Sequence, residues 1–157
     1  MRMIERLQND DDARACAAMM CATDPWITIG RGFDECLAAV ADPTREVWLA
    51  REDGAVRGFV IINMRGAFIG YIQTVCVDAG ARGSGLGSRL VAFAEERIFR
   101  ETPNVFLCVS SFNPRARALY ERLGYDAIGE LKDYIIEGAS EILMRKTLGP
   151  LRPKSTT

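Results

Sequence analysis

The chain of 157 residues contains no histidine. Catalytic groups of the Ser-His-Asp or Cys-His type are therefore excluded, and so are most zinc sites, since imidazole is their usual nitrogen ligand. No apolar run reaches the roughly 18 residues that a membrane-spanning helix needs, so we expect no membrane partner. The formal net charge of −1 gives no broad basic surface, which argues against nucleic acid as a partner.

Cysteine usage points to a reducing compartment. The five cysteines include no C-x-x-C pair, and an odd number of scattered cysteines favours reduced thiols in a cytosolic protein. Residues 1–6 lack the hydrophobic core of a signal peptide, so we expect a cytoplasmic location. The length fits one domain. We expect residues 1–148 to form that domain and residues 149–157, with Pro150 and Pro153, to be a disordered tail.

Hydrophobic periodicity predicts seven strands and four helices in the order β-α-α-β-β-β-α-β-α-β-β. The dipeptide Asp53-Gly54 between two apolar runs favours an antiparallel hairpin. Asp10–Asp12 are expected to cap the first helix and form its acidic first turn, and residues 24–30 to form an irregular loop. The expected strands are 3–7, 46–51, 55–64, 67–77, 105–109, 125–131 and 142–147, and the expected helices are 10–19, 33–40, 86–100 and 114–123.

Residues 75–90 hold the most informative pattern, a strand-like run followed by a glycine-rich turn and an amphipathic helix. Gly83, Gly85 and Gly87 let the backbone curl tightly and approach a ligand without side-chain clash. A helix that begins there presents unpaired N–H groups and the positive end of its dipole, which suits a phosphate or pyrophosphate. The residues expected to bind this ligand are Val75, Cys76, Val77, Arg82, Gly83, Ser84, Gly85, Leu86, Gly87 and Ser88.

Three kinds of glycine loop compete for this segment. A Walker A loop needs a Lys after the glycines, and none follows here. A dinucleotide fingerprint needs a third glycine where Ser88 stands, and is expected after an opening strand rather than in mid-chain. The third pattern, [Q/R]-x-x-G-x-[G/A], is met by residues 82–87, which resemble the acyl-CoA pyrophosphate loop of the GCN5-related N-acetyltransferases, the GNAT superfamily. A strand–helix turn that binds no ligand would also fit the glycines.

A second segment carries the same resemblance. Residues 113–125, NPRARALYERLGY, are similar to the GNAT pattern N-x-x-x-x-x-L-Y-x-x-x-G-[FY]. Their spacing on a helix places Asn113 and Tyr120 within about 20° on one face and about 10.5 Å apart along the axis. The resemblance implies that Asn113 hydrogen-bonds the pantetheine arm and that the Tyr120 hydroxyl points at the thioester sulfur. A purely structural role is also open, in which Asn113 only caps the helix and Tyr120 fills the core beside Leu119.

A tyrosine suits that position in an acetyl transfer. When a neutral amine attacks the acetyl carbonyl, a thiolate leaves and takes up a proton. A thiol has a pKa of about 8.5 and a phenol one of about 10, so Tyr120 is protonated at neutral pH and can act as the general acid. Ala116, Leu119 and Leu123 are expected to form the buried stripe of the same helix.

The resemblance spans about residues 3–147 and implies an α/β fold of the GNAT type, a mixed and mostly antiparallel sheet of about six or seven strands flanked by about four helices. It also implies acetyl-CoA as the cosubstrate, with no metal. Backbone groups of Val75–Val77 are then expected to pair with pantetheine, and a backbone N–H there to stabilise the oxyanion. The Cys76 side chain needs no chemical role, since alternation places it opposite its two neighbours.

The general base is not evident from the sequence. Many GNAT enzymes carry a Glu on the strand that matches residues 67–77, but here no acid precedes Asp78. In the ribosomal-protein N-terminal acetylases a Glu stands five residues before the Asn, and Cys108 occupies that position here. Gln73 could only orient a water. A chain of waters could also carry the proton, and so could a carboxylate reaching in from a loop, for which the candidates are Glu35, Asp133 and Glu137.

The acceptor is expected between the first helical region and the last hairpin loop. Trp26 and Tyr134 can cover an apolar or aromatic acceptor, while Asp133 and Glu137 can attract its ammonium group. The residues expected to bind it are Trp26, Phe33, Gln73 and Tyr134. The sequence thus predicts acetyl transfer to a primary amine, with a small molecule favoured over a protein N-terminus or lysine, and a homodimer from family habit alone. The rival interpretation is a non-catalytic acyl-CoA-binding or regulatory module, which has no use for Tyr120 as an acid.

Overall fold

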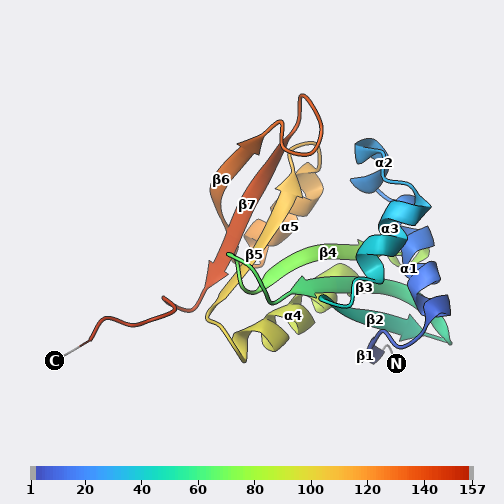
Figure 1. Cartoon of the computed structure of the whole chain (residues 1–157), viewed down its shortest axis with the longest axis horizontal. Coiled ribbons are helices and arrows are strands. Elements are labelled where there is room, and N and C mark those ends of the chain that lie inside the picture. The colour runs from blue at the N-terminus through green and yellow to red at the C-terminus, as the bar shows by residue number, and fades with distance from the viewer. Residues whose placement is uncertain (1–2, 156–157) are drawn as a thin grey trace.

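The computed structural model describes residues 3–155, which form a seven-stranded sheet and five α-helices (Figure 1). In chain order the elements are β1 (Met3–Arg6), α1 (Asp10–Cys21), α2 (Trp26–Ile29), α3 (Phe33–Val40), β2 (Glu46–Glu52), β3 (Ala55–Asn63), β4 (Tyr71–Val77), the 3₁₀ turn η1 (Ala79–Ala81), α4 (Leu86–Phe99), β5 (Asn104–Ser110), α5 (Pro114–Arg122), β6 (Asp126–Lys132) and β7 (Ser140–Thr147).

The sheet is mixed and mostly antiparallel, as the sequence predicts. Its strand order is β1-β2-β3-β4-β5-β7-β6, and the pair β4–β5 is parallel while the other neighbours are antiparallel. The parallel pair lies near the centre of the sheet, where the chain leaves β4, forms α4 and returns as β5. This crossover places the glycine loop at the end of a central strand.

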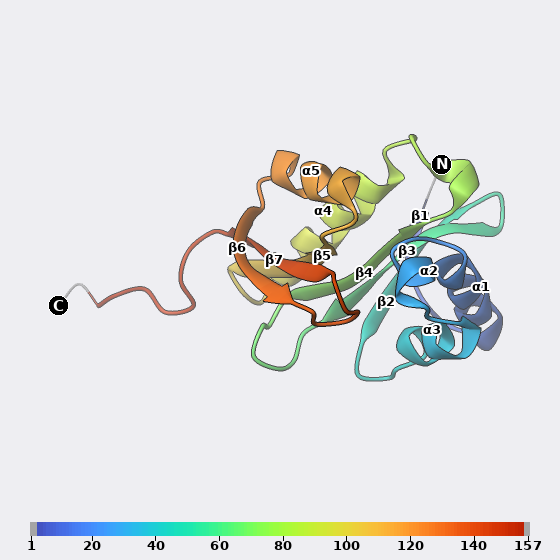
Figure 2. The same ribbon diagram turned by 90° about the horizontal axis from the view of Figure 1, so that it is seen from above.

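Helices cover both faces of the sheet. Figure 2 shows α4 and α5 on one face and α1, α2 and α3 on the other. Each layer has its own hydrophobic core, and alternation along β3 supplies both: Val60 and Ile62 pack toward α4, while Phe59 and Ile61 pack toward α1. The sheet is therefore buried on both sides in its middle strands, which fixes their register.

The hairpin at Asp53-Gly54 is confirmed. Its two turn residues both have positive φ, 52° and 78°, which is the conformation of a type I′ turn. Glycine adopts it freely and aspartate with little cost, so the turn sets the register between β2 and β3 locally.

Three expectations about the element ends are wrong. The side chain of Asn9 caps α1 by accepting from the Asp12 backbone N–H at 2.9 Å, so Asp10–Asp12 form the first turn but not the cap. Residues 24–30 are not irregular, because they contain the short helix α2. The third long strand begins at Tyr71 rather than at 67, because Gly66 and Gly70, both with positive φ near 90°, turn the chain first.

At the C-terminus, residues 149–155 form neither helix nor strand. The disordered tail and the single domain at 1–148 remain predictions, and the tail's last two residues lie outside the described part. None of the helices in residues 3–155 combines the length and the apolar content that crossing a bilayer takes.

Candidate active site

The central feature of the site is the separation of β4 from β5. The two strands pair at Tyr71–Phe106 and Ile72–Leu107, and no further bridge between them occurs in residues 3–155. Opposite β3, the register jumps from Ile72 to Thr74, which leaves Gln73 as the extra residue of a β-bulge. Beyond this bulge the two strands diverge (Figure 1), and the edge of β4 that faces β5 offers backbone groups to a ligand.

The glycine loop leads into α4 without a side-chain cap. Gly83 and Gly85 have φ values of 77° and 79°, in the left-handed region that glycine adopts without strain. Gly85 is the N-cap of α4, and the first N–H groups of that 14-residue helix have no partner within the helix. A Cβ on either glycine would meet no atom within 4 Å, so the backbone conformation, not crowding, requires glycine at both positions.

A cavity of about 600 Å³ lies between this loop, the end of β4 and α5, and we call it the loop cavity. Three arginines, Arg82, Arg115 and Arg122, are among its lining residues, which suits a ligand that carries several phosphates. Of the residues predicted to bind the ligand, those that line it are Val75, Cys76, Val77, Arg82, Gly83, Gly85, Leu86, Gly87 and Ser88. Ser84 is not among them, and its hydroxyl donates to the Ala81 carbonyl.

A second cavity of about 310 Å³, the hairpin cavity, lies between α2, the diverging strands and the loop that joins β6 to β7. Trp26, Gln73 and Tyr134, three of the residues expected to bind the acceptor, line it. Phe33, the other residue expected at the acceptor, instead packs partly against the core under α1 and α3 and lines neither cavity. Asn113 lies on the wall of the hairpin cavity, not of the loop cavity.

Tyr120 lies where the two cavities meet. Together with Val75 and Ala116, it lines both of them. Burial in this apolar junction raises the pKa of its phenol to about 12, so the hydroxyl keeps its proton at neutral pH. A group placed between two cavities and holding a proton is suited to protonate an atom that leaves one ligand as another attacks it.

Asn113 caps α5, as the sequence predicts. Its side-chain oxygen accepts from the backbone N–H of Ala116 at 3.3 Å, and Pro114 takes the first helical position. The cap engages only the oxygen of the amide. Capping therefore fixes where the side chain lies on the cavity wall and does not conflict with a role in binding.

The expected buried stripe on α5 is confirmed only in part. No residue of α5 is fully buried, and Ala116, Tyr120 and Leu123 are the side chains that pack partly against the core. Leu119 lines the loop cavity instead. The physical reason is that α5 roofs a cavity, so its inner face meets open space where a solid core was expected.

Cys76 behaves as a structural residue. Its side chain is 1% exposed and packs in the core beneath α1, opposite to Val75 and Val77, as alternation predicts. Burial raises the pKa of its thiol to about 12, which keeps it protonated and unreactive. Cys76 therefore contributes to the loop cavity as part of strand β4, and its sulfur has no role there.

Sequence reasoning missed a polar group on the floor of the hairpin cavity. Tyr71, Ser110 and Glu141 line it, together with Arg31. Glu141 is 8% exposed, and burial raises the pKa of its carboxyl, although a hydrogen bond with Ser110 and the charge of Arg31 oppose that shift. The sequence signal that could have identified this group was a charged residue, Glu141, directly before the apolar strand run Ile142–Met144.

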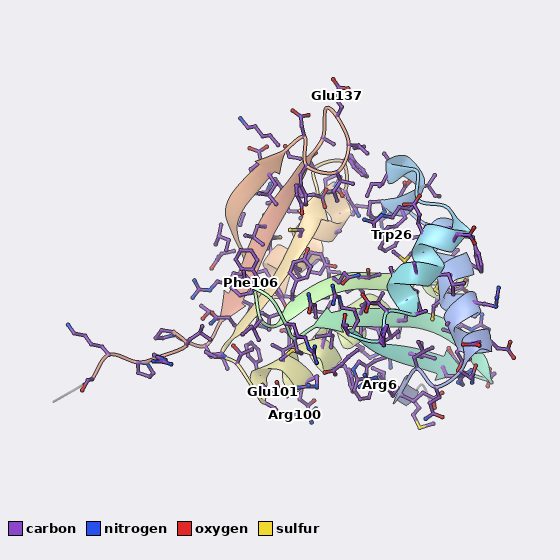
Figure 3. All side chains as sticks on the ribbon, in the orientation of Figure 1. Arg6, Trp26, Arg100, Glu101, Phe106 and Glu137 are labelled. Atoms are coloured by element: carbon purple, nitrogen blue, oxygen red, sulfur yellow. The ribbon has the colours of Figure 1, made fainter. Side chains whose placement is uncertain are left out.

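The three carboxylates that the sequence offered as candidate general bases lie outside both cavities. Glu35, Asp133 and Glu137 are exposed and line neither cavity. Figure 3 shows Glu137 at the tip of the β6–β7 loop, pointing away from the sheet. Asp133 accepts from the Gly138 backbone N–H at 2.6 Å and so stabilises that loop. Within residues 3–155 there is no group of three or more side chains suited to hold a metal ion.

Comparison with known proteins identifies the family. A family model described as "Acetyltransferase (GNAT) family" matches residues 10–125. The N-alpha-acetyltransferase RimI of Mycobacterium tuberculosis is 30% identical over 146 residues, 88% of each chain. The blasticidin-S acetyltransferase of Streptomyces morookaense is 34% identical over 91 residues, 54% of this chain and 67% of that protein. A solved aminoglycoside 6′-N-acetyltransferase in complex with coenzyme A has the same fold, with a TM-score of 0.76 at 19% identity, over 97% of this chain and 99% of that one.

The chain therefore belongs to the GNAT family and is an acetyl-CoA-dependent acetyltransferase. Acetyl-CoA is the cosubstrate of this family, and the loop cavity fits it by its own chemistry. An uncapped helix N-terminus and three arginines meet the charge of the phosphates, and the unpaired edge of β4 offers backbone groups to an amide-bearing arm.

Proposed function

We propose that this protein transfers the acetyl group of acetyl-CoA to a primary amine of a small molecule, by direct attack within a ternary complex. The observation that carries the proposal is the meeting of two cavities at Tyr120, through the opening between β4 and β5. One cavity has the features that phosphates need, and the other is lined by aromatic and acidic side chains. A thioester and an amine can therefore approach each other from two sides of the sheet.

The residues of the chain divide the work between them. Acetyl-CoA, when bound, supplies the acetyl group as an activated thioester. The glycine loop and the start of α4 hold its phosphates, and the free edge of β4 at Val75–Val77 orients the arm and offers an oxyanion donor. Asn113 contributes its side-chain amide on the wall of the hairpin cavity. Tyr120 keeps its proton until a sulfur leaves, and then donates it.

The size and lining of the hairpin cavity support a small acceptor. About 310 Å³ matches the lower end of the volumes of small-molecule sites. Trp26, Tyr71 and Tyr134 supply aromatic walls, and Asp24 and Glu141 supply negative charge for an ammonium group. The blasticidin-S and aminoglycoside acetyltransferases are named for small-molecule acceptors, which adds support for this class.

A protein N-terminus is the second candidate acceptor. It is favoured by the N-alpha-acetyltransferase of M. tuberculosis, since the similarity to that relative spans 88% of both chains. A peptide would enter the hairpin cavity with its first residue only and leave the rest of its chain over α2 and the β6–β7 loop. The departure at Cys108, where the N-terminal acetylases carry a Glu, speaks against it.

An assay of coenzyme A release distinguishes these acceptors. Purified protein and acetyl-CoA are incubated with a panel of aminoglycosides, nucleoside antibiotics, polyamines, amino acids and short peptides, and free thiol is measured. We expect release that depends on a small amine and an acetylated product of the matching mass. Transfer to peptides alone would favour the second acceptor class. Tight binding of coenzyme A without transfer to any amine would support the non-catalytic binding module and overturn the proposal.

The homodimer and the cytoplasmic location stay predictions from the sequence. The mass of the purified protein in solution, measured by light scattering after gel filtration, tests the first. Fractionation of the source cells with an antibody against the chain tests the second.

A further inference from the structure

We propose that Glu141 is the general base that takes the proton of the acceptor's ammonium group, with Ser110 as its positioning residue. The inference deepens the proposed acetyl transfer and rests on it. Among the described residues, two carboxylates line the hairpin cavity, those of Asp24 and Glu141. These two differ in exposure and in the hydrogen bonds that they already accept.

Asp24 is committed to the fold of its own segment. One of its carboxylate oxygens accepts from both the backbone N–H and the hydroxyl of Thr28, at 3.1 and 2.7 Å. These bonds close the first turn of α2, and the aspartate is exposed. The Asp24 oxygen that accepts these two hydrogen bonds is held in the turn of its own segment. Asp24 therefore has a structural role in α2, and its exposed position at the cavity gives an ammonium group negative charge without enclosing it.

Glu141 has the opposite environment. It belongs to β7 and pairs with Ser110 on β5, the strand that runs directly into Asn113 and α5. Its side chain is more than nine-tenths buried and contributes to the cavity wall. Tyr120 lines the same cavity, so one continuous space joins the carboxylate to the phenol.

The groups that face Glu141 act on the pKa of its carboxyl in opposite directions. Burial raises its pKa above the ordinary value, while the Ser110 hydrogen bond and the Arg31 charge counter part of that rise. Tyr71 on β4 and Cys108 on β5 face it as neutral groups, because burial and their mutual hydrogen bond raise the Tyr71 pKa and burial raises that of Cys108. Asp24 lines the same cavity.

In the proposed reaction Glu141 acts as the base and Tyr120 as the acid, and each handles a different proton. The ammonium group of the acceptor loses one proton to Glu141, and the freed lone pair forms the new N–C bond. The C–S bond breaks, its electron pair leaves with the sulfur, and the sulfur takes the proton of Tyr120. The second proton of the attacking nitrogen returns to the Tyr120 oxygen, and Glu141 passes the first proton to water. The net products are the amide, coenzyme A and one released proton.

The test compares Glu141→Gln with Glu137→Gln as the matched control, using an amine that the wild-type protein acetylates. Glu137 precedes β7, in the β6–β7 loop, and its exposed side chain points away from the sheet (Figure 3). We expect Glu141→Gln to lower kcat/KM at pH 7 by about 10²–10⁴, the usual contribution of a positioned base. Its rate should rise about tenfold per pH unit up to the pKa of the free amine, because only neutral amine then reacts. The wild type and Glu137→Gln should reach a plateau well below that pH.

A pH profile of Glu141→Gln that matches the wild type, at an equal rate, would overturn the inference. Acetyl-CoA affinity and the melting temperature show whether the variant is folded, and both should be unchanged, since Glu141 does not line the loop cavity. If Glu141→Gln does not fold, Ser110→Ala provides the test. Because the Ser110 hydrogen bond lowers the pKa of the Glu141 carboxyl, its loss raises that pKa. The acidic limb of the pH profile of kcat/KM must then move to higher pH. An unmoved limb contradicts the inference. If the wild type acetylates no amine at all, the proposed function fails instead.

Discussion

The ring of Tyr120 meets the ring of Tyr125 edge-on, with centroids 5.9 Å apart and planes inclined by 70°. The same two residues are joined through the backbone, where the N–H of Tyr125 donates to the Tyr120 carbonyl at 2.9 Å. Tyr125 is 2% exposed and belongs to the core, whereas Tyr120 faces the cavities. The proposed acid is therefore held by a rigid neighbour at the point where α5 ends.

Tyr120→Phe removes the proposed proton donor and keeps the ring. We expect turnover to fall by about 10²–10⁴, because the thiolate must then leave without a positioned acid. The affinity for acetyl-CoA should change less than twofold, since the ring still forms the cavity wall. Steady-state kinetics with the acceptor found in the thiol assay, together with calorimetric titration of acetyl-CoA, measure both quantities.

Tyr125→Phe is the matched control for this experiment. Its hydroxyl is buried and has no hydrogen-bond partner within residues 3–155, so its removal costs no hydrogen bond. We expect full activity and a melting temperature equal to or above that of the wild type. Equal losses of turnover in both phenylalanine variants would mean that packing at α5, not proton transfer, explains the effect at Tyr120.

Gly85→Ala tests the glycine loop. The φ of 79° places an alanine there in the left-handed region, which costs about 1–2 kcal/mol in stability. The same strain displaces the first turn of α4, so acetyl-CoA affinity should fall at least tenfold. Gly129→Ala in β6 is the control, because its φ is not positive and an added Cβ meets Leu143 at an ordinary 4.0 Å. Chemical denaturation and ligand titration compare the two. Unchanged acetyl-CoA affinity in Gly85→Ala would remove the loop from the binding site.

Local patterns explain what the sequence could predict. The conformations at Gly83, Gly85, Asn113 and Asp53-Gly54 are set by neighbouring residues, so short motifs identify them. The missed helix α2 and the late start of β4 also have local causes. Asp24 accepts hydrogen bonds that close the first turn of α2, and turns at Gly66 and Gly70 delay β4. A pattern of apolar and polar residues does not include these interactions.

The acceptor side could be predicted only in part, because it is assembled from segments that are distant in sequence. Glu141 becomes part of the site only because β7 pairs with β5 and places it opposite Ser110. Phe33 looked suitable beside Trp26 in the sequence, yet α3 turns it toward the core. The roles of side chains around a cavity depend on the strand order, which hydrophobic alternation does not encode.

The ion pair between buried Glu95 and half-buried Lys146 joins α4 to β7, with 2.8 Å between the Lys146 nitrogen and a carboxylate oxygen. The Lys146 ammonium also lies 5.9 Å from the Tyr125 ring centroid. Lys146→Met leaves the buried Glu95 carboxylate without its partner, and we expect a loss of about 1–2 kcal/mol in unfolding free energy, measured by urea denaturation, because solvent already screens the half-buried Lys146. The double variant Glu95→Leu/Lys146→Met should recover most of that loss. Equal instability of the single and double variants would contradict a charge-based cause.

Tyr134→Ala tests which cavity holds the acceptor. Tyr134 lines the hairpin cavity and is 67% exposed, so its removal has little effect on folding. Loss of an aromatic wall weakens acceptor binding, and we expect KM for the amine to rise about tenfold, equivalent to about 1.4 kcal/mol, while acetyl-CoA affinity is unchanged. Ile128→Ala is the control, because Ile128 is also exposed but lies on β6 outside both cavities. Kinetics with the amine varied at saturating acetyl-CoA give KM for the amine, and titration of acetyl-CoA gives its affinity separately. If KM for the amine stays the same in Tyr134→Ala, the acceptor lies outside the hairpin cavity, and the assignment of Glu141 as its base fails with it.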